Sequence, residues 1–74
     1  MGQVKDEKLL KEIAIKIKAL RESKGITQEA FYHDTNIHIG RIETGKNNLS
    51  VSSLKAICKY FGITLKEFFS KMDF

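Results

Sequence analysis

The sequence contains one cysteine, Cys58, which excludes an intrachain disulfide and cannot by itself form a zinc site. Proline and tryptophan are absent. No apolar run approaches the ~20 residues that a membrane-crossing helix needs, and the first ten residues, MGQVKDEKLL, lack the apolar stretch of a secretory signal. A free cysteine without an export signal is typical of a reducing compartment, so we expect a cytoplasmic protein that does not contact a membrane.

The chain is also too short to hold more than one domain. Its 74 residues predict a single domain over residues 1–74, with residues 1–5 frayed. A domain of this size buries only about 60% of the surface that its unfolded chain exposes, which makes self-association the expected source of extra stability. The net charge of +4 permits nucleic-acid binding, although many small domains carry such a surplus.

The sequence gives no support for catalysis. His33 and His38 stand five positions apart, which would place them on different faces of one helix. Cys58 falls in an apolar stripe, where core packing is the expected role, and neither paired carboxylates nor a phosphate-binding loop is present. We therefore expect no enzymatic activity, no metal site and no cofactor.

Apolar periodicity predicts one long helix at the start of the chain. The three- and four-residue steps between its apolar residues give one buried face over Glu7 to Lys24, and Gly25 ends the helix. The residues of this face are Leu10, Ile13, Ile17 and Leu20, with Ile15 and Ala19 widening it.

Capping residues divide the rest of the chain into four shorter helices. Thr27 is the expected N-cap of a helix in the stretch QEAFYHDT, and Asn36 is the expected cap of a helix over residues 37–44 that Gly45 ends. Ser50 caps a helix over residues 51–61, and Thr64 opens the last helix with a capping box. No segment alternates with the period of a strand, so the predicted fold is all-α, a compact bundle of five helices.

Two stretches, ALRESKGITQEA and IGRIETGKNNLSVSSLKAICKYFGITLKEFF, together resemble the phage-repressor/Cro-type (XRE) helix-turn-helix family. The resemblance covers roughly residues 9–69. It implies a helix-turn-helix bundle in which the third helix reads the major groove of DNA. It also implies that Arg21 and Glu43 form a structural ion pair that holds this recognition helix against the first helix.

The chain departs from the family pattern in the recognition region. Glu43 follows Gln28 by 15 positions, about three fewer than in the family. Three residues are close to one helical turn, so their removal rotates the rest of the helix by only ~60° and leaves Ile39 and Ile42 able to face the core. The turn or the leading end of the recognition helix is therefore expected to be shortened.

The resemblance implies a set of DNA contacts in this region. Gln28 would bind a phosphate at a helix N-terminus, and Arg41 would meet a phosphate or a guanine edge. Asn36 and His38 stand at the shortened leading end of the recognition helix. Asn36 is either a DNA contact or a helix cap, and His38 is either a DNA contact or an ordinary surface histidine. Gly40 either lets the backbone approach DNA or relieves crowding.

The loop after the recognition helix supplies further expected contacts. Thr44, Lys46 and Asn47 would lie against the sugar-phosphate backbone, although asparagines are also ordinary turn residues. The leading hypothesis is a small bacterial or phage transcriptional regulator that binds double-stranded DNA as a homodimer and has no small-molecule effector domain. Its C-terminal phenylalanines, Phe68, Phe69 and Phe74, are the candidate dimer surface; the alternative role of Phe68 is to close the core of the monomer. The alternative function is an antitoxin-like protein-interaction module that kept the fold and lost specific DNA reading.

Overall fold

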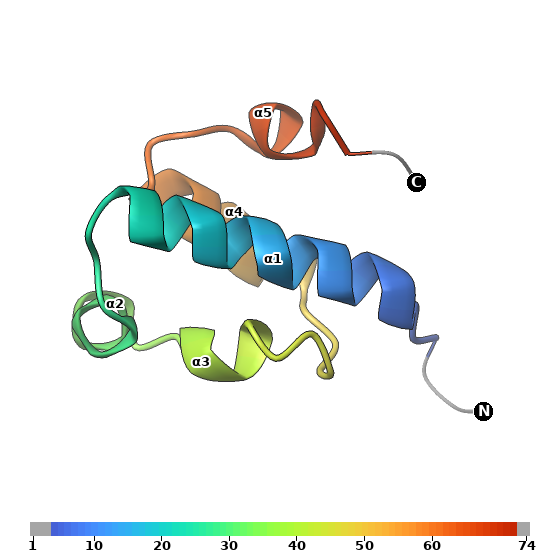
Figure 1. The fold of residues 1–74 in the computed structure, drawn as a ribbon, viewed down its shortest axis with the longest axis horizontal. Coiled ribbons are helices and arrows are strands. Elements are labelled where there is room, and N and C mark those ends of the chain that lie inside the picture. The colour runs from blue at the N-terminus through green and yellow to red at the C-terminus, as the bar shows by residue number, and fades with distance from the viewer. Residues whose placement is uncertain (1–3, 73–74) are drawn as a thin grey trace.

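The computed structural model describes residues 4–72, and every regular element in that range is an α-helix (Figure 1). The helices are α1, Glu7–Ser23; α2, Gln28–Thr35; α3, Ile39–Ile42; α4, Val51–Tyr60; and α5, Leu65–Phe69. The prediction of an all-α bundle of five helices is therefore confirmed.

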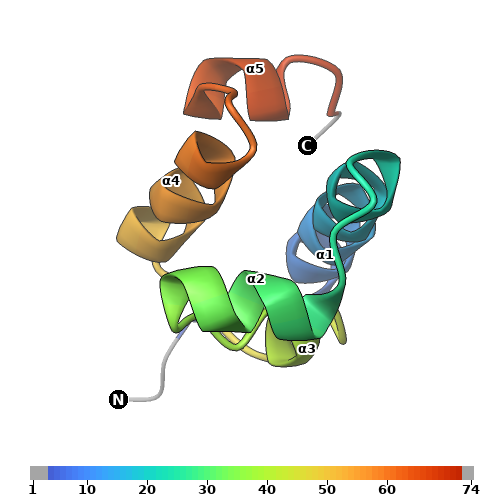
Figure 2. The ribbon, with the colours of Figure 1, turned by 90° about the vertical axis from the view of Figure 1, so that its left-hand side faces the viewer.

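The bundle surrounds one apolar core. Figure 2 shows α1 and α4 facing each other, with α5 across one edge of the pair and α2 and α3 across the opposite edge. Phe31 on α2 lies in this core, with its ring centroid 4.7 Å from that of Tyr60 and 5.5 Å from that of Phe61. The largest fully buried side chains come from all five helices: Ile17, Phe31, Ile39, Ile57, Cys58 and Phe68.

Three of the predicted N-caps are confirmed. The hydroxyl of Thr27 accepts a hydrogen bond from the backbone N–H of residue 30, and that of Ser50 accepts one from the N–H of residue 53. At α5 the Thr64 hydroxyl accepts from the N–H of Glu67, while the Glu67 carboxylate accepts from the N–H of Thr64. These side chains satisfy amides that the first turn of each helix leaves unpaired.

The prediction for Asn36 is wrong. Asn36 does not open α3; it ends α2 in the left-handed conformation, with φ of 63°, and its N–H donates to the carbonyl of Tyr32. His38 occupies the position before α3, and α3 covers Ile39–Ile42 rather than residues 37–44. Asparagine suits both a helix N-cap and a left-handed C-terminal position, and here the second role prevails.

Two predictions about apolar surface are also wrong. Ile15, expected to widen the buried face of α1, is 63% exposed, and Ala19 is exposed as well. Phe68 is fully buried, so its alternative role of closing the monomer core is confirmed and it cannot contribute to a dimer surface, while Phe69 is half-buried. Phe74, and residues 1–3 of the segment expected to be frayed, lie outside the described residues.

Candidate nucleic-acid interface

The helix α3, which the resemblance predicts to be the recognition helix, is short, and its apolar residues fix it to the core. Ile39 is 1% exposed, and Ile42 is half-buried against the same core. Between them Gly40 is half-buried and the side chain of Arg41 is exposed. A helix of four residues thus faces the protein interior with two side chains and presents one long cationic side chain to solvent.

An ion pair between Arg21 of α1 and Glu43 joins the end of α3 to the scaffold. The Arg21 Nε donates to Glu43 Oε2 at 2.7 Å, and Nη2 donates to Oε1 at 3.0 Å. The third guanidinium nitrogen, Nη1, donates to the carbonyl of Ile26 at 2.8 Å. Both side chains are nearly buried, so the pair fixes the position of α3 instead of serving as a solvent-exposed contact.

This environment shifts both ionisation equilibria toward the charged forms. Burial acts to raise the pKa of Glu43, but hydrogen bonds from Arg21 and Gln28 outweigh it, so the pKa lies below its ordinary value. The hydrogen bond to Glu43 raises the pKa of Arg21 above its ordinary value, although burial acts to lower it. The pair is therefore charged at neutral pH.

Gln28 belongs to the same network. Its Nε2 donates to Glu43 Oε1 at 3.0 Å, which ties the first residue of α2 to the end of α3. A Cβ atom at position 40 would lie 3.1 Å from Gln28 Oε1. The glycine at position 40 thus relieves crowding against Gln28. A backbone contact of Gly40 with DNA stays a prediction, as does a phosphate contact of Gln28.

Asn36 and His38 stand at the leading end of α3, and both are exposed. The His38 ring packs against the ring of Tyr32, with centroids 4.5 Å apart and planes tilted by 31°. Tyr32 is 40% exposed, and the sequence reasoning missed it. The available signal was its spacing: Tyr32 follows Gln28 by four positions, which places both on one side of α2.

The loop after α3 is held to that helix by its own side chains. Thr44 Oγ1 donates to the carbonyl of Arg41 at 2.6 Å, and Asn47 Nδ2 donates to the same carbonyl at 3.4 Å. The backbone N–H of Lys46 donates to Thr44 Oγ1 at 3.3 Å. Thr44 and Asn47 therefore shape the loop, while the Lys46 side chain is exposed and takes no part in these bonds.

The structure thus brings the predicted residues together in two groups. Gln28, Gly40 and Glu43 meet where α2 crosses α3, and Arg41, Thr44 and Asn47 meet where α3 ends. Figure 1 shows α2, α3 and the following loop on one side of α1, with α5 on the other side. The predicted contacts therefore share one side of the bundle.

Other kinds of site find little support among the described residues. Residues 4–72 contain no group of three or more His, Cys, Asp or Glu side chains arranged to hold a metal ion. No helix in the described part of the chain has the length and apolarity needed to cross a bilayer. Cys58 is 1% exposed, and burial raises the pKa of its thiol, as suits a residue that packs in the core.

A comparison with protein-family models matches residues 17–68 to a helix-turn-helix family. The matched range begins within α1 and ends within α5, so it includes α2, α3 and the residues of the ion pair. No curated protein and no solved structure matches the chain.

Proposed function

The chain belongs to the XRE-type helix-turn-helix family of DNA-binding regulators, and from this premise we propose that it is a sequence-specific transcriptional regulator. It would bind operator half-sites on double-stranded DNA as a homodimer and act as a small repressor or autoregulatory controller in the cytoplasm. The family consists of DNA-binding proteins rather than enzymes, which is why the proposal assigns no reaction to the chain.

The observation that carries the proposal is the fixed position of α3. The Arg21–Glu43 pair and buried Ile39 hold the helix, while the Arg41 side chain is exposed beside the loop that carries Lys46. A fixed helix with an outward cation can meet a phosphate or the O6 and N7 atoms of guanine without a further entropic cost for ordering its backbone. Lys46 suits a sequence-independent phosphate contact.

The length of α3 sets the expected selectivity. A four-residue helix offers few side chains to base edges, and each good bidentate contact provides ~1–3 kcal/mol of discrimination. Two such contacts give about 2–6 kcal/mol, near the low end of the ~4–10 kcal/mol typical of specific DNA-binding proteins. We therefore expect DNA shape and the spacing of two half-sites to supply much of the selectivity.

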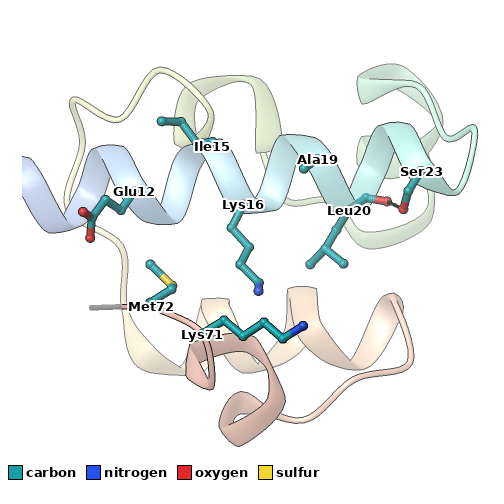
Figure 3. A pocket seen from close by; sticks show the side chains of 8 residues that line it. All are labelled: Glu12, Ile15, Lys16, Ala19, Leu20, Ser23, Lys71 and Met72. Carbon is teal, nitrogen blue, oxygen red and sulfur yellow. Dashed lines mark hydrogen bonds between the residues drawn. The ribbon is translucent and has the colours of Figure 1, made fainter. Parts of the chain in front are cut away.

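The homodimer requires a surface other than Phe68. A hollow of about 540 Å³ between α1 and the segment after α5 offers one (Figure 3). In Figure 3 Lys16 and Leu20 point from α1 toward the segment that carries Lys71 and Met72, whereas the Ile15 side chain is drawn on the side of α1 away from that segment. Ile15 also lines the hollow and is exposed. Its lining residues are Glu12, Ile15, Lys16, Ala19, Leu20, Ser23, Lys71 and Met72.

The charges around this hollow favour a second copy of the chain as its occupant. In a two-fold dimer, each contact between two different residues occurs twice. Glu12 of one copy can then pair with Lys71 of the other, and the reciprocal pair forms at the same time, while Ile15 becomes covered. A dimer would also supply the stability that a 74-residue bundle lacks.

The alternative proposal is a protein-interaction module that kept this fold without specific DNA reading. Two observations favour it: α3 has only four residues, and one amide N–H of Gln28 is engaged by Glu43. The exposed cations on the side of α3 favour the DNA-binding regulator.

Titration of duplex DNA separates the two proposals. The wild type would be compared with Arg41→Ala, Lys46→Ala and the control His33→Ala, on an operator selected from genomic fragments and on a scrambled duplex. With ~4 phosphates neutralised per monomer, the logarithm of affinity should fall with the logarithm of salt concentration, with a slope of about −3.6 per monomer bound.

The variants should differ in whether they weaken binding mainly to the operator or to both duplexes. Arg41→Ala should weaken operator binding more than binding to the scrambled duplex, and Lys46→Ala should weaken both equally and make the slope shallower by about one. His33 is exposed on α2, and its replacement by alanine should leave the affinity for both duplexes unchanged. Wild-type binding that does not depend on salt, or equal binding by Arg41→Ala and wild type on both duplexes, would favour the interaction module.

A further inference from the structure

A second basic feature lies where the first half of α1 meets the loop after α3. A hollow of about 400 Å³ is formed there by two segments that are far apart in the sequence. Its lining residues are Lys5, Glu7, Lys11, Thr44, Gly45 and Lys46. Of its three lysines, only Lys46 belongs to the sequence motifs, because Lys5 and Lys11 both precede the first motif stretch, ALRESKGITQEA.

The close approach of the two segments depends on Gly45. This residue is buried, has φ of +72°, and a Cβ atom built on it would lie 3.0 Å from the Cα atom of Lys11. The loop backbone therefore rests directly on the backbone of α1. Since Thr44 also ties the loop to the end of α3, Lys46 is held beside Lys11 at a defined place.

The hollow carries a net positive charge. The side chains of Lys5, Lys11 and Lys46 are exposed, and none of them forms an ion pair within residues 4–72. Glu7 is the single carboxylate of the lining. Three ammonium groups around one hollow repel one another, and an anion that enters the hollow relieves this repulsion.

The hollow faces the proposed DNA. Figure 1 shows that the chain enters α1 from the side on which α3 lies, and the loop after α3 passes along that same side. A duplex that contacts α2 and α3 therefore continues toward the hollow. Its nearest anions are backbone phosphates, which recur regularly along each strand and present no sequence information.

We propose that Lys5, Lys11 and Lys46 together form a phosphate-binding cradle that holds the DNA backbone beyond the C-terminal end of α3. The proposal rests on the DNA-binding function above and extends it to the first helix. The cradle would add sequence-independent affinity to a protein whose recognition helix offers few base contacts. Glu7, which also lines the hollow, would oppose that affinity.

The test compares two charge-matched double variants on a random-sequence duplex. Lys5→Gln/Lys11→Gln removes two cations from the cradle, and Lys59→Gln/Lys66→Gln removes two exposed cations from α4 and α5. Both changes lower the net charge by the same amount, and glutamine is a good helix former. The measured quantity is the slope of log affinity against log salt concentration between about 50 and 200 mM.

The cradle variant should have a slope shallower than wild type by roughly 0.9 for each phosphate that is no longer neutralised, whereas the control should keep the wild-type slope. For each such phosphate, the ratio of affinities at about 50 and 200 mM salt should fall by about threefold. Glu7→Gln should change affinity in the opposite direction and tighten binding, which a mere decrease in stability would not do.

The outcomes distinguish the cradle from the DNA-binding function on which it rests. Salt-dependent binding by the wild type, with equal slopes for the cradle variant and its control, overturns the cradle and leaves the DNA-binding function in place. An absence of wild-type binding to any duplex overturns both. A shallower slope in the cradle variant alone, together with tighter binding by Glu7→Gln, supports the cradle.

Discussion

Replacing Gly45 by alanine tests the contact on which the loop after α3 depends. Three glycines in the described chain have positive φ: Gly25 at 66°, Gly45 at 72° and Gly62 at 75°. A Cβ atom at position 45 would lie 3.0 Å from the Lys11 Cα atom, whereas one at position 25 or 62 would meet nothing within 4 Å. The three substitutions therefore share the same backbone strain, and only Gly45→Ala adds a steric conflict with another backbone segment.

The expected costs come from these two effects. An alanine in the left-handed conformation costs ~1–2 kcal/mol, and the reduced freedom of the unfolded chain returns ~0.4–1 kcal/mol. Gly25→Ala and Gly62→Ala should therefore destabilise the protein by about 0–1.5 kcal/mol. Gly45→Ala must also move the loop or α1, which adds ~1–3 kcal/mol.

Thermal and urea unfolding, followed by far-ultraviolet circular dichroism, would measure the three variants against wild type. An additional ~2 kcal/mol corresponds to a Tm lower by roughly 8–16 °C for a domain of this size. Since a 74-residue domain is stable by only about 4–11 kcal/mol, the variant remains measurable at low temperature. If Gly45→Ala unfolds within error of the other two variants, the close approach of the loop to α1 is wrong, and so is the geometry of the cradle.

Three further predictions concern Glu43, Gly40 and Ile15. The pKa of Glu43 in the folded protein lies below its unfolded value of ~4.3, so its ionised carboxylate stabilises the fold fully above pH ~4.3 and loses that effect as the pH falls through the folded pKa. The unfolding free energies of wild type and Glu43→Gln should therefore differ at neutral pH and converge in acid. Parallel curves of unfolding free energy against pH for the two proteins would contradict this prediction. Gly40→Ala should change stability by less than ~1 kcal/mol, because the added Cβ meets only the flexible end of the Gln28 side chain. The effect of Gly40→Ala on DNA affinity should disappear in a Gln28→Ala background, and additive effects of the two substitutions would show that the two positions are independent. Ile15→Glu should produce monomers in sedimentation while the similarly exposed control Val51→Glu does not, and an unchanged Ile15→Glu dimer would place the interface elsewhere.

The sequence predicted the elements of this fold that local chemistry determines. Thr27, Ser50 and Thr64 each cap the helix expected of them because a hydroxyl before an apolar periodic segment satisfies that helix's own amides. Asn36 misled the prediction of α3 because its side chain suits two opposite ends of a helix. Local patterns could not decide which role applies, since the choice depends on where the following residues pack.

Features that depend on tertiary contacts were less predictable. Ile15 fits the apolar periodicity of α1, yet no neighbouring helix among the described residues covers its position on the circumference, and it stays exposed. The bond between Gln28 and Glu43, and the stacking of Tyr32 on His38, join residues whose proximity exists only after α2 and α3 have packed together. Family resemblance indicated the region of the site but not these partners.

The burial of Cys58 has a practical consequence for studying the motions of this protein. It is the single cysteine of the chain, 1% exposed in the core, and burial raises the pKa of its thiol. A thiol-specific reagent can therefore react only with molecules in which α4 has separated from its neighbours. The rate of labelling reports how often the core opens, without any engineered probe, and its decrease on adding DNA would measure how strongly the bound duplex holds the bundle closed.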